Sequence, residues 1–437
     1  MLQAGSLCNS AQHKVRIVKA LWVIGAVVLS LASVPSAMAA EDTKVSANDT
    51  GIGGQATDSK TDSHGGGIPL TAGYEKIPTN GFFIRSKDEE FRLNIGAYTQ
   101  ARYDINWRDA PVGEDDVEEG FSLNRTRIFL EGQFTPAFDY HFRFNIDDDS
   151  EFSLLVAYLQ YNIGNKWSVR AGRQFIATSR EDWMLAQDTL TTEFSPNDFT
   201  FALGTAMGIQ ANYQAERTRF WLSLNDGSVG AKRDFPDAET SDFGLTGRWE
   251  YQIAGRDWSS WDDQVGRRGR PRGVLLGFAG GYQTQDDTSG FDQGGQFQAD
   301  VSFNGSGYQA MIAGSWTWQE PVAAESYSNY GLLVQGGYFI AEHWQVYGQY
   351  NFISPGDQPS SPTCSPPLCK LEPFNSITAG ISYFPFLWTN RWKFSAEVAH
   401  LFDALNATIV KPSGSLGWLA SDESGQTYFR IQAQFGF

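Results

Sequence analysis

The sequence feature that most constrains the fold is a strict alternation of apolar and polar residues, repeated in segments of about ten residues from Phe82 onwards. Residues 91–107 show it best. Their apolar face carries Phe91, Leu93, Ile95, Ala97, Thr99, Ala101, Tyr103, Ile105 and Trp107, and their other face carries Arg92, Asn94, Gly96, Tyr98, Gln100, Arg102, Asp104 and Asn106. Successive side chains of a β-strand point to opposite faces, so the segment predicts one strand with an apolar and a polar side. Residues 426–437 repeat the pattern.

The length of these segments separates a membrane barrel from a soluble sandwich. Strands in soluble sheets are usually about five or six residues long, whereas a tilted strand that crosses a bilayer needs about 9–11. The segments here have the second length and carry aromatic residues near their ends, as strands of membrane barrels do. Aromatic residues make up 14% of the chain, which argues against intrinsic disorder.

Sixteen segments fit this description, which predicts an all-β transmembrane antiparallel β-barrel of about 16 strands. They are 91–107, 121–135, 138–147, 152–163, 167–175, 205–215, 217–226, 243–253, 274–285, 295–304, 307–318, 328–340, 343–353, 374–384, 391–402 and 426–437. Short turns and long loops alternate between them, which places all the short turns at one rim. Residues 254–273 are the exception, because this long, arginine-rich and tryptophan-containing stretch stands where a short turn is expected.

The N-terminal region divides into a leader and a linker. Lys14, Arg16 and Lys19 precede an apolar run that ends in Ala37-Met38-Ala39, the pattern of a signal peptide, so residues 1–39 are predicted to be removed on export. A membrane anchor would need a longer apolar run. Residues 40–80 are polar and predict a flexible tail, and residues 81–437 form the predicted barrel domain.

The mature chain is acidic and contains two cysteines. Removal of three basic residues with the leader takes the formal charge from −17 to −20, which makes a nucleic-acid partner improbable. Cys364 and Cys369 lie in a proline-rich segment, where a loop disulfide and two free thiols are both open. The segment offers no further zinc ligands, and no pattern in the chain calls for a cofactor.

The polar side of the strands predicts a positively charged lumen. A barrel of sixteen strands is too wide for its own side chains to fill, so it holds water. Eleven basic and six acidic residues fall on the predicted inner face, an excess of about five positive charges that favours anions. Pairing of these arginines with acids across strands, which would only order the wall, is the alternative. The candidate lumen-lining residues are Arg92, Arg102, Arg125, Arg127, Arg143, Arg170, Arg219 and Arg248.

The long loop 176–204 is the candidate for a constriction. It follows the fifth predicted strand, and we expect it to fold into the pore with Arg180, Glu181 and Asp182 at the narrowing. An external surface loop is the alternative. Its acidic balance works against strong anion selectivity.

Several stretches resemble the phosphate-selective porin O and P family. They are residues 81–87 (GFFIRSK), 91–96 (FRLNIG), 121–132 (FSLNRTRIFLEG), 138–144 (FDYHFRF) and 169–175 (VRAGRQF). The resemblance implies a trimeric sixteen-stranded pore in which an arginine ladder and a lysine-lined constriction select phosphate or polyphosphate. Arg125 and Arg127 match the positions of lumen arginines in this resemblance. The loop 176–204 has no lysine and departs from the family here.

The sequence thus predicts an outer-membrane porin for passive diffusion of small hydrophilic solutes, with a preference for anions. Its expected partners are outer-membrane lipid, small anions, the barrel assembly machinery through Phe437, and two further copies of the chain. A pore for sugars or other neutral solutes and a plugged adhesive barrel remain as alternatives. An enzyme is not expected, because no His in the mature chain stands beside a Ser and an acid in a triad-like pattern.

Overall fold

The structure is a computed structural model that describes residues 70–75, 81–146, 152–227, 241–285, 291–322, 325–356 and 371–437. The leader 1–39, most of the tail and the Cys364–Cys369 segment lie outside the described residues, so the predictions about them stay predictions. Among the described residues, no helix is both long and apolar enough to cross a membrane.

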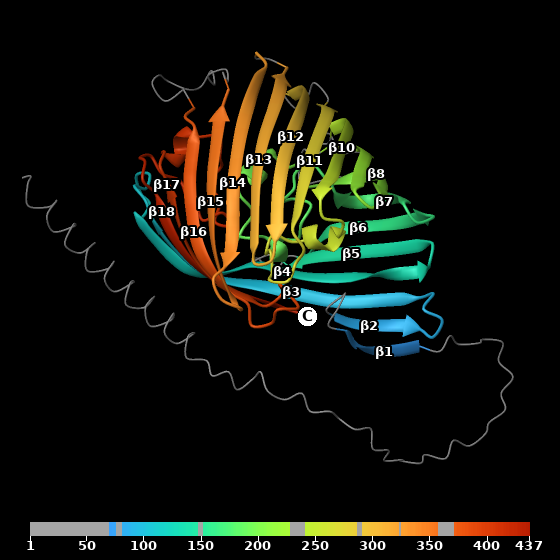
Figure 1. Cartoon of the computed structure of the whole chain (residues 1–437). Helices are drawn as coiled ribbons and strands as arrows, with labels where there is room; N and C mark the ends of the chain where they lie inside the picture. Colours follow the sequence, from blue (N-terminus) through green and yellow to red (C-terminus); the bar gives the residue numbers. More distant parts are fainter. Residues whose placement is uncertain are drawn as a thin grey trace, which may run out of the picture. The chain divides into compact units, whose positions relative to one another are not determined.

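The wall is a closed antiparallel barrel of sixteen strands, β3 to β18 (Figure 1). Each strand pairs with its successor, and β18 returns to β3 through ten register pairs from Thr427↔Trp107 to Gly436↔Tyr98. The predicted fold and all sixteen predicted strands are confirmed. The strands are β3 (Arg92–Trp107), β4 (Val117–Thr135), β5 (Phe138–Ile146), β6 (Phe152–Ile163), β7 (Trp167–Phe175), β8 (Thr205–Gln214), β9 (Thr218–Asn225), β10 (Ser241–Ala254), β11 (Gly273–Gln285), β12 (Phe291–Gly305), β13 (Tyr308–Pro321), β14 (Tyr327–Phe339), β15 (Trp344–Pro355), β16 (Phe374–Tyr383), β17 (Lys393–Leu401) and β18 (Thr427–Gly436).

Two strands that the sequence did not predict form a hairpin outside the wall. They are β1 (Leu70–Glu75) and β2 (Gly81–Ser86), which pair with each other. β2 also pairs with residues 92–95 of β3, next to the stretch that β18 occupies. Both strands have six residues, too few for the long alternation that revealed the wall. The strand β1 therefore lies inside the region 40–80 that we expected to be a tail.

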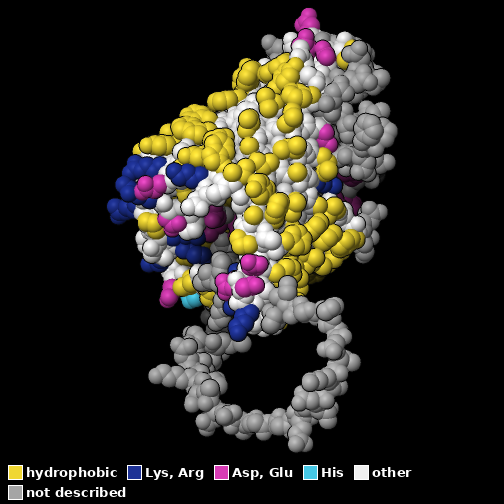
Figure 2. All heavy atoms as spheres, turned by 90° about the vertical axis from the view of Figure 1, so that its right-hand side faces the viewer, with side chains coloured by type: hydrophobic (Ala, Val, Ile, Leu, Met, Phe, Trp, Pro, Cys, Tyr) yellow, Lys and Arg dark blue, Asp and Glu magenta, His cyan; other side chains and the backbone are white. Residues whose placement is uncertain are grey.

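The outer face of the wall is apolar, as a lipid-facing surface must be. Figure 2 shows hydrophobic side chains gathered over the strands, with charged side chains toward the ends of the barrel. Exposed examples are Leu159 on β6, Leu222 on β9 and Ile312 on β13. The same strands turn Gln160, Ser223 and Met311 inward, so the alternation read from the sequence corresponds to lipid and lumen sides.

The two rims of the barrel differ. At one rim, here the turn side, β4–β5, β6–β7, β8–β9, β12–β13 and β14–β15 are joined by a few residues each. The opposite rim, the loop side, carries the long connections. β4 begins at Val117, so part of the acidic stretch 108–120, which we expected to be loop, is strand. Among the described residues, four short helical segments lie in connections: η2 (Ala186–Asp188), α2 (Pro196–Phe201), η3 (Trp258–Trp261) and η5 (Leu405–Ala407).

Candidate functional site

The connection between β7 and β8, residues 176–204, lies inside the barrel, and we call it the in-folded connection. Its buried residues include Ile176, Arg180, Leu190 and Thr192, each at most 1% exposed. Asn197 near its end donates to the backbone oxygen of Leu332 at 3.0 Å. The connection is therefore held against the inner wall by its own side chains.

Glu193 is the first anchor of the in-folded connection. Its carboxylate accepts hydrogen bonds from Arg102 (2.9 Å), Arg125 (2.7 Å) and Asn124 (2.9 Å). A β-bulge in β4 makes this possible, because Gln100 pairs with Arg125 while Ala101 pairs with Leu123, leaving Asn124 as an extra residue. Burial opposes ionisation of Glu193, but the two guanidinium groups outweigh it and hold its pKa below the usual value.

Glu250 on β10 is the second anchor. Its oxygens accept from Arg180 of the in-folded connection at 3.1 Å, from Arg219 at 2.6 Å and from Arg248 at 2.9 Å. Arg248 also contacts Asp300 on β12 at 2.8 Å. The Glu250 side chain is 0% exposed, so three arginines meet one fully buried carboxylate.

Glu397 on β17 is the third anchor. It accepts from the backbone nitrogen of Thr192 at 3.1 Å and from the hydroxyl groups of Tyr347 (2.9 Å) and Tyr428 (3.2 Å). Lys393, also on β17, donates to the backbone oxygen of Thr189 at 3.0 Å. The in-folded connection is thus tied to β3, β4, β10 and β17, which surround it.

A second loop-side connection, residues 402–426, packs over the same strands. Its Leu405, Val410, Leu416 and Trp418 form an apolar cluster with Phe374 and other residues of the wall. Its backbone oxygens accept from wall side chains, for example Ser415 from Arg102 at 2.8 Å. On β3, β8–β10 and β12–β18 most inward polar side chains are consequently buried. We call this part of the lumen the filled half.

The inner face of β4–β7 is different, and we call it the open half. Most of its inward side chains are partly exposed rather than buried. These partly exposed residues are Arg127, Glu131, Asp139, His141, Asn145, Tyr158, Gln160 and Arg170. Neither connection covers them, so the space left in the barrel runs along this wall.

Three arginines of the open half have no acidic partner among the described residues. Arg127 donates to the Tyr98 hydroxyl at 3.1 Å, and Arg170 donates to Gln160 at 2.6 Å. Arg143 is only 7% exposed, lies 3.3 Å from the His141 ring and packs over Phe175. In the described part of the chain, no carboxylate oxygen lies within ion-pair distance of any of the three, which leaves their charge available to a solute.

A row of side chains crosses the open half near the turn side. Glu131 lies 3.1 Å from His141, whose ring stacks on Tyr158 with centroids 5.3 Å apart. Arg170 lies over the same tyrosine ring at 4.7 Å. The row borders a hollow of about 290 Å³ that also contacts Asp139. Charged groups therefore line the turn-side end of this space.

Asp182 of the in-folded connection interacts electrostatically with Arg127 of the open half. Burial raises its pKa to about 7, while a backbone hydrogen bond from Gly204 and the charge of Arg127 act in the opposite direction. The Asp182 side chain is buried, and one of its carboxylate oxygens has no hydrogen-bond partner among the described residues. Its charge changes near neutral pH, opposite a fixed arginine.

The structure divides the predicted lumen residues into separate groups. Arg127, Arg143 and Arg170 line the open half. Arg102, Arg125, Arg219 and Arg248 are neutralised by buried carboxylates, as is Arg180 of the predicted constriction. Arg92 pairs with Glu75 of the β1–β2 hairpin at 2.6 Å.

The expected excess of five positive charges was counted over the whole lumen and stays a prediction, and the open half holds only part of those residues. Its three unpaired arginines face the two carboxylates of Glu131 and Asp139. Pairing across the wall, the alternative reading of the arginines, holds for the filled half. The sequence did not predict Glu193 as the acidic partner of Arg102 and Arg125, because it lies in a loop far from both residues in the sequence.

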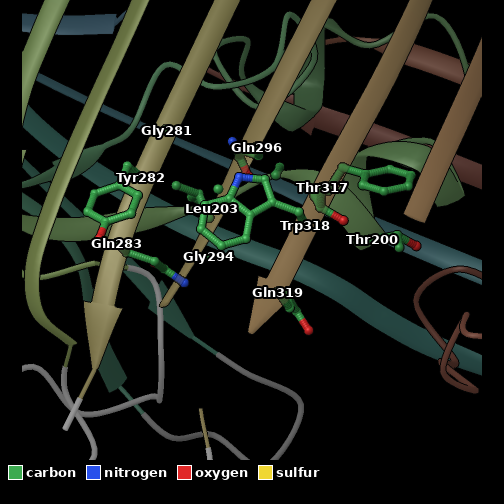
Figure 3. A pocket seen from close by; sticks show the side chains of 13 residues that line it. Thr200, Leu203, Gly281, Tyr282, Gln283, Gly294, Gln296, Thr317, Trp318 and Gln319 are labelled. Carbon is green, nitrogen blue, oxygen red and sulfur yellow. The ribbon is translucent and has the colours of Figure 1, made fainter. Parts of the chain in front are cut away.

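A smaller hollow lies between the end of the in-folded connection and β11–β13 (Figure 3). Its volume is about 150 Å³, and Thr200 and Leu203 face Gln283, Gln296 and Thr317 across it. Tyr282 and Trp318 also border the hollow. No charged side chain of the described residues lines this hollow.

Comparison with known proteins agrees with this architecture. Residues 95–251 match the family described as phosphate-selective porin O and P. The predicted family resemblance is confirmed. The matched stretch of the chain contains the whole open half, from β4 to β7. No curated protein matches the chain in a comparison of sequences.

Solved porin structures share the fold at low sequence identity. An anion-selective porin from Comamonas acidovorans has a TM-score of 0.55 at 15% identity, covering 80% of this chain and 100% of its own. The outer membrane channel DcaP of Acinetobacter baumannii gives 0.52 at 12%, covering 81% and 99%. OmpT of Vibrio cholerae in its trimer form gives 0.52 at 9%, covering 79% and 99%.

Proposed function

We propose that this porin is an outer-membrane channel through which small hydrophilic solutes diffuse passively, with a preference for anions. The observation that carries the proposal is the set Arg127, Arg143 and Arg170, which line the uncovered half of the lumen without carboxylate partners among the described residues. In the filled half, by contrast, the wall arginines Arg102, Arg219 and Arg248 are paired with buried carboxylates.

The physical argument rests on the cost of an uncompensated charge. A buried charge without a partner is unfavourable by several kcal/mol, and a mobile anion lowers that cost. Arg143 is the strongest case, because its side chain is buried against Phe175 and the His141 ring. Arginines along a narrow aqueous path also raise the local concentration of anions through their summed field.

We also infer that the protein lies in the outer membrane and assembles as a homotrimer. The predicted leader 1–39 supports export, and the apolar outer face fits outer-membrane lipid. Assembly as a homotrimer is supported by the trimer form of the similar Vibrio cholerae barrel. Phe437, whose backbone exchanges hydrogen bonds with Ala97 (2.9 and 3.1 Å), is our candidate signal for the barrel assembly machinery.

Reversal potentials in a planar bilayer test the proposal. With purified protein and a potassium chloride gradient, an anion-preferring channel reverses toward the chloride equilibrium potential. Replacing chloride by phosphate on one side then ranks the two anions. A reversal potential on the potassium side, or the absence of conductance, would overturn the proposal.

Passage of neutral solutes is the second candidate function. The hollow of Figure 3, lined by glutamine amides and threonine hydroxyls, favours it because such groups hydrogen-bond to uncharged polyhydroxylated molecules. Liposome swelling in isosmotic solutions of uncharged sugars measures this directly. Swelling that equals the rate for small anions of similar size would favour the neutral-solute function over anion preference.

A further inference from the structure

The connection between β10 and β11, residues 255–272, enters the barrel although it belongs to the rim of short turns. We call it the turn-side connection. Trp261 is 3% exposed, and Gln264 and Val265 are 0% exposed. A connection that merely joined two strands at the surface would leave such side chains in water. Their burial shows that this segment lies inside the barrel.

The wall holds the turn-side connection along its length. Trp261 donates to Gln252 on β10 at 3.2 Å, and Gln345 on β15 donates to the backbone oxygen of Val265 at 2.5 Å. Val265 packs with Phe339 and Phe384.

Two arginines of the turn-side connection form hydrogen bonds further around the turn-side rim. Arg267 donates to the backbone oxygen of Thr389 at 2.6 Å, and Arg268 to that of Phe339 at 2.7 Å. The segment therefore reaches from β10 to the β16–β17 connection and covers the turn-side end of the filled half.

Inside the barrel, the turn-side connection meets the in-folded connection. The backbone nitrogen of Gln264 donates to the backbone oxygen of Asp188 at 2.9 Å. The side-chain oxygen of Gln264 accepts from the backbone nitrogen of Leu190 at 3.0 Å. Arg180, one of the predicted constriction residues, also donates to the backbone oxygen of Trp261.

These contacts make the two connections dependent on each other. A buried backbone group that loses its hydrogen-bond partner destabilises the fold, and neither segment can withdraw alone without leaving such groups behind. Gln264 is the central residue, because it satisfies one backbone donor and one backbone acceptor of the η2 region. No other residue of the turn-side connection makes this paired contact among the described residues.

We propose that the turn-side connection is a second channel-forming segment, and that Gln264 is a positioning residue that sets how far the in-folded connection projects toward Arg127, Arg143 and Arg170. The turn-side connection thus acts on the width of the passage through the in-folded connection that it holds. The inference rests on the proposed function, because it assumes that the barrel conducts.

Single-channel recording of Gln264→Ala tests the proposal. Loss of the side-chain oxygen frees the Leu190 nitrogen, so we expect a higher conductance and more frequent transitions between conductance levels than in the wild type. The matched control is Arg272→Ala, whose side chain is exposed on the same connection, and we expect wild-type traces from it. A properly assembled Q264A barrel with unchanged conductance and fluctuations would overturn the inference.

If Q264A assembles poorly, a reversible cross-link between the two connections tests the same inference. In the double variant Asp188→Cys with Gln264→Cys, the two cysteines replace residues that are joined by a backbone hydrogen bond of 2.9 Å, and oxidation is used to link them. The oxidised form should show quiet, wild-type conductance, and reduction should raise both conductance and fluctuations, whereas each single cysteine variant should not respond to oxidant. Equal traces before and after reduction would contradict the inference.

The experiment separates this inference from the proposed function. A wild-type barrel that conducts no ions overturns the proposed function, and the inference with it. A wild type that conducts with anion preference, together with an unresponsive Q264A and an unresponsive cysteine pair, overturns the inference alone.

Discussion

The two halves of the lumen use the same residue type for different purposes. In the filled half, Arg102, Arg219 and Arg248 contact buried carboxylates and hold connections against the wall. In the open half, Arg127 and Arg170 contact only uncharged groups among the described residues. The difference teaches that the number of arginines on a strand face says little about selectivity. The position of the acids decides which arginines remain available to a solute.

The largest effect is expected from a substitution that removes a buried carboxylate in the filled half. In Glu250→Gln, Arg180, Arg219 and Arg248 lose the charge that compensates them inside the wall. Removing one partner from a buried ion cluster destabilises a protein by about 3–5 kcal/mol, so we expect a loss of this order in the free energy of unfolding. Urea unfolding in detergent, followed by the gel shift between folded and unfolded barrel, measures it. An unfolding midpoint equal to that of the wild type would show that the cluster does not stabilise the filled half.

The next largest effect is expected from reversing one charge in the open half. Arg127→Glu changes the charge at the unpaired wall by two units, and we expect the reversal potential in a potassium chloride gradient to move toward that of potassium. Arg256→Glu makes the same change at a side chain that is 66% exposed on the turn side, and serves as the matched control. Equal shifts in the two variants would mean that overall charge, and not the open half, determines selectivity.

A smaller effect depends on pH and on Asp182, which faces the open half from the in-folded connection. Since burial raises its pKa to about 7, Asp182 is charged above that pH and neutral below it. The charge that offsets Arg127 is lost on acidification, so anion preference should increase as the pH falls from 8 to 6. Asp182→Asn should show the acid-side selectivity at both values. His141 also gains charge in acid, and the part of the change that D182N removes belongs to Asp182.

The smallest effect concerns an ion pair of the same chemistry in an exposed place. Glu75→Gln removes the contacts of the β1–β2 hairpin with Arg92 (2.6 Å) and Arg85 (3.3 Å), whose side chains are 27% and 32% exposed. Ion pairs of this kind contribute about 1 kcal/mol or less. We expect faster hydrogen exchange in β2 with unchanged conductance and unfolding midpoint. A loss as large as that of E250Q would remove the distinction between buried and exposed pairs.

The wall was predictable because its signal is local. Alternation along a strand depends on neighbouring residues alone, so all sixteen strands could be placed from the sequence. The hairpin β1–β2 could not, because Leu70–Glu75 is too short and polar to show the pattern. Its stability comes from pairing with β2, which continues along the edge of β3.

The lumen was only partly predictable because its partners are distant in the sequence. Arg102 and Glu193 are 91 residues apart, and Arg180 and Glu250 are 70 apart. Strand periodicity can place each arginine on the inner face, but it contains no information about which loop carboxylate will reach it. Strand periodicity also cannot predict where a connection packs. The length and the arginines of residues 254–273 are visible in the sequence, but their entry into the barrel is not.

The bulge at Asn124 has a consequence for how this chain tolerates changes of length. Deleting one residue from a regularly paired part of a wall strand would exchange the lipid and water sides for the remainder of that strand. Deleting Asn124 would instead remove the surplus residue, leaving Arg125 beside Gln100 and Leu123 beside Ala101 as they are now. The position is thus a place where the wall can lose a residue and keep its inside and outside, at the expense of one hydrogen bond to Glu193.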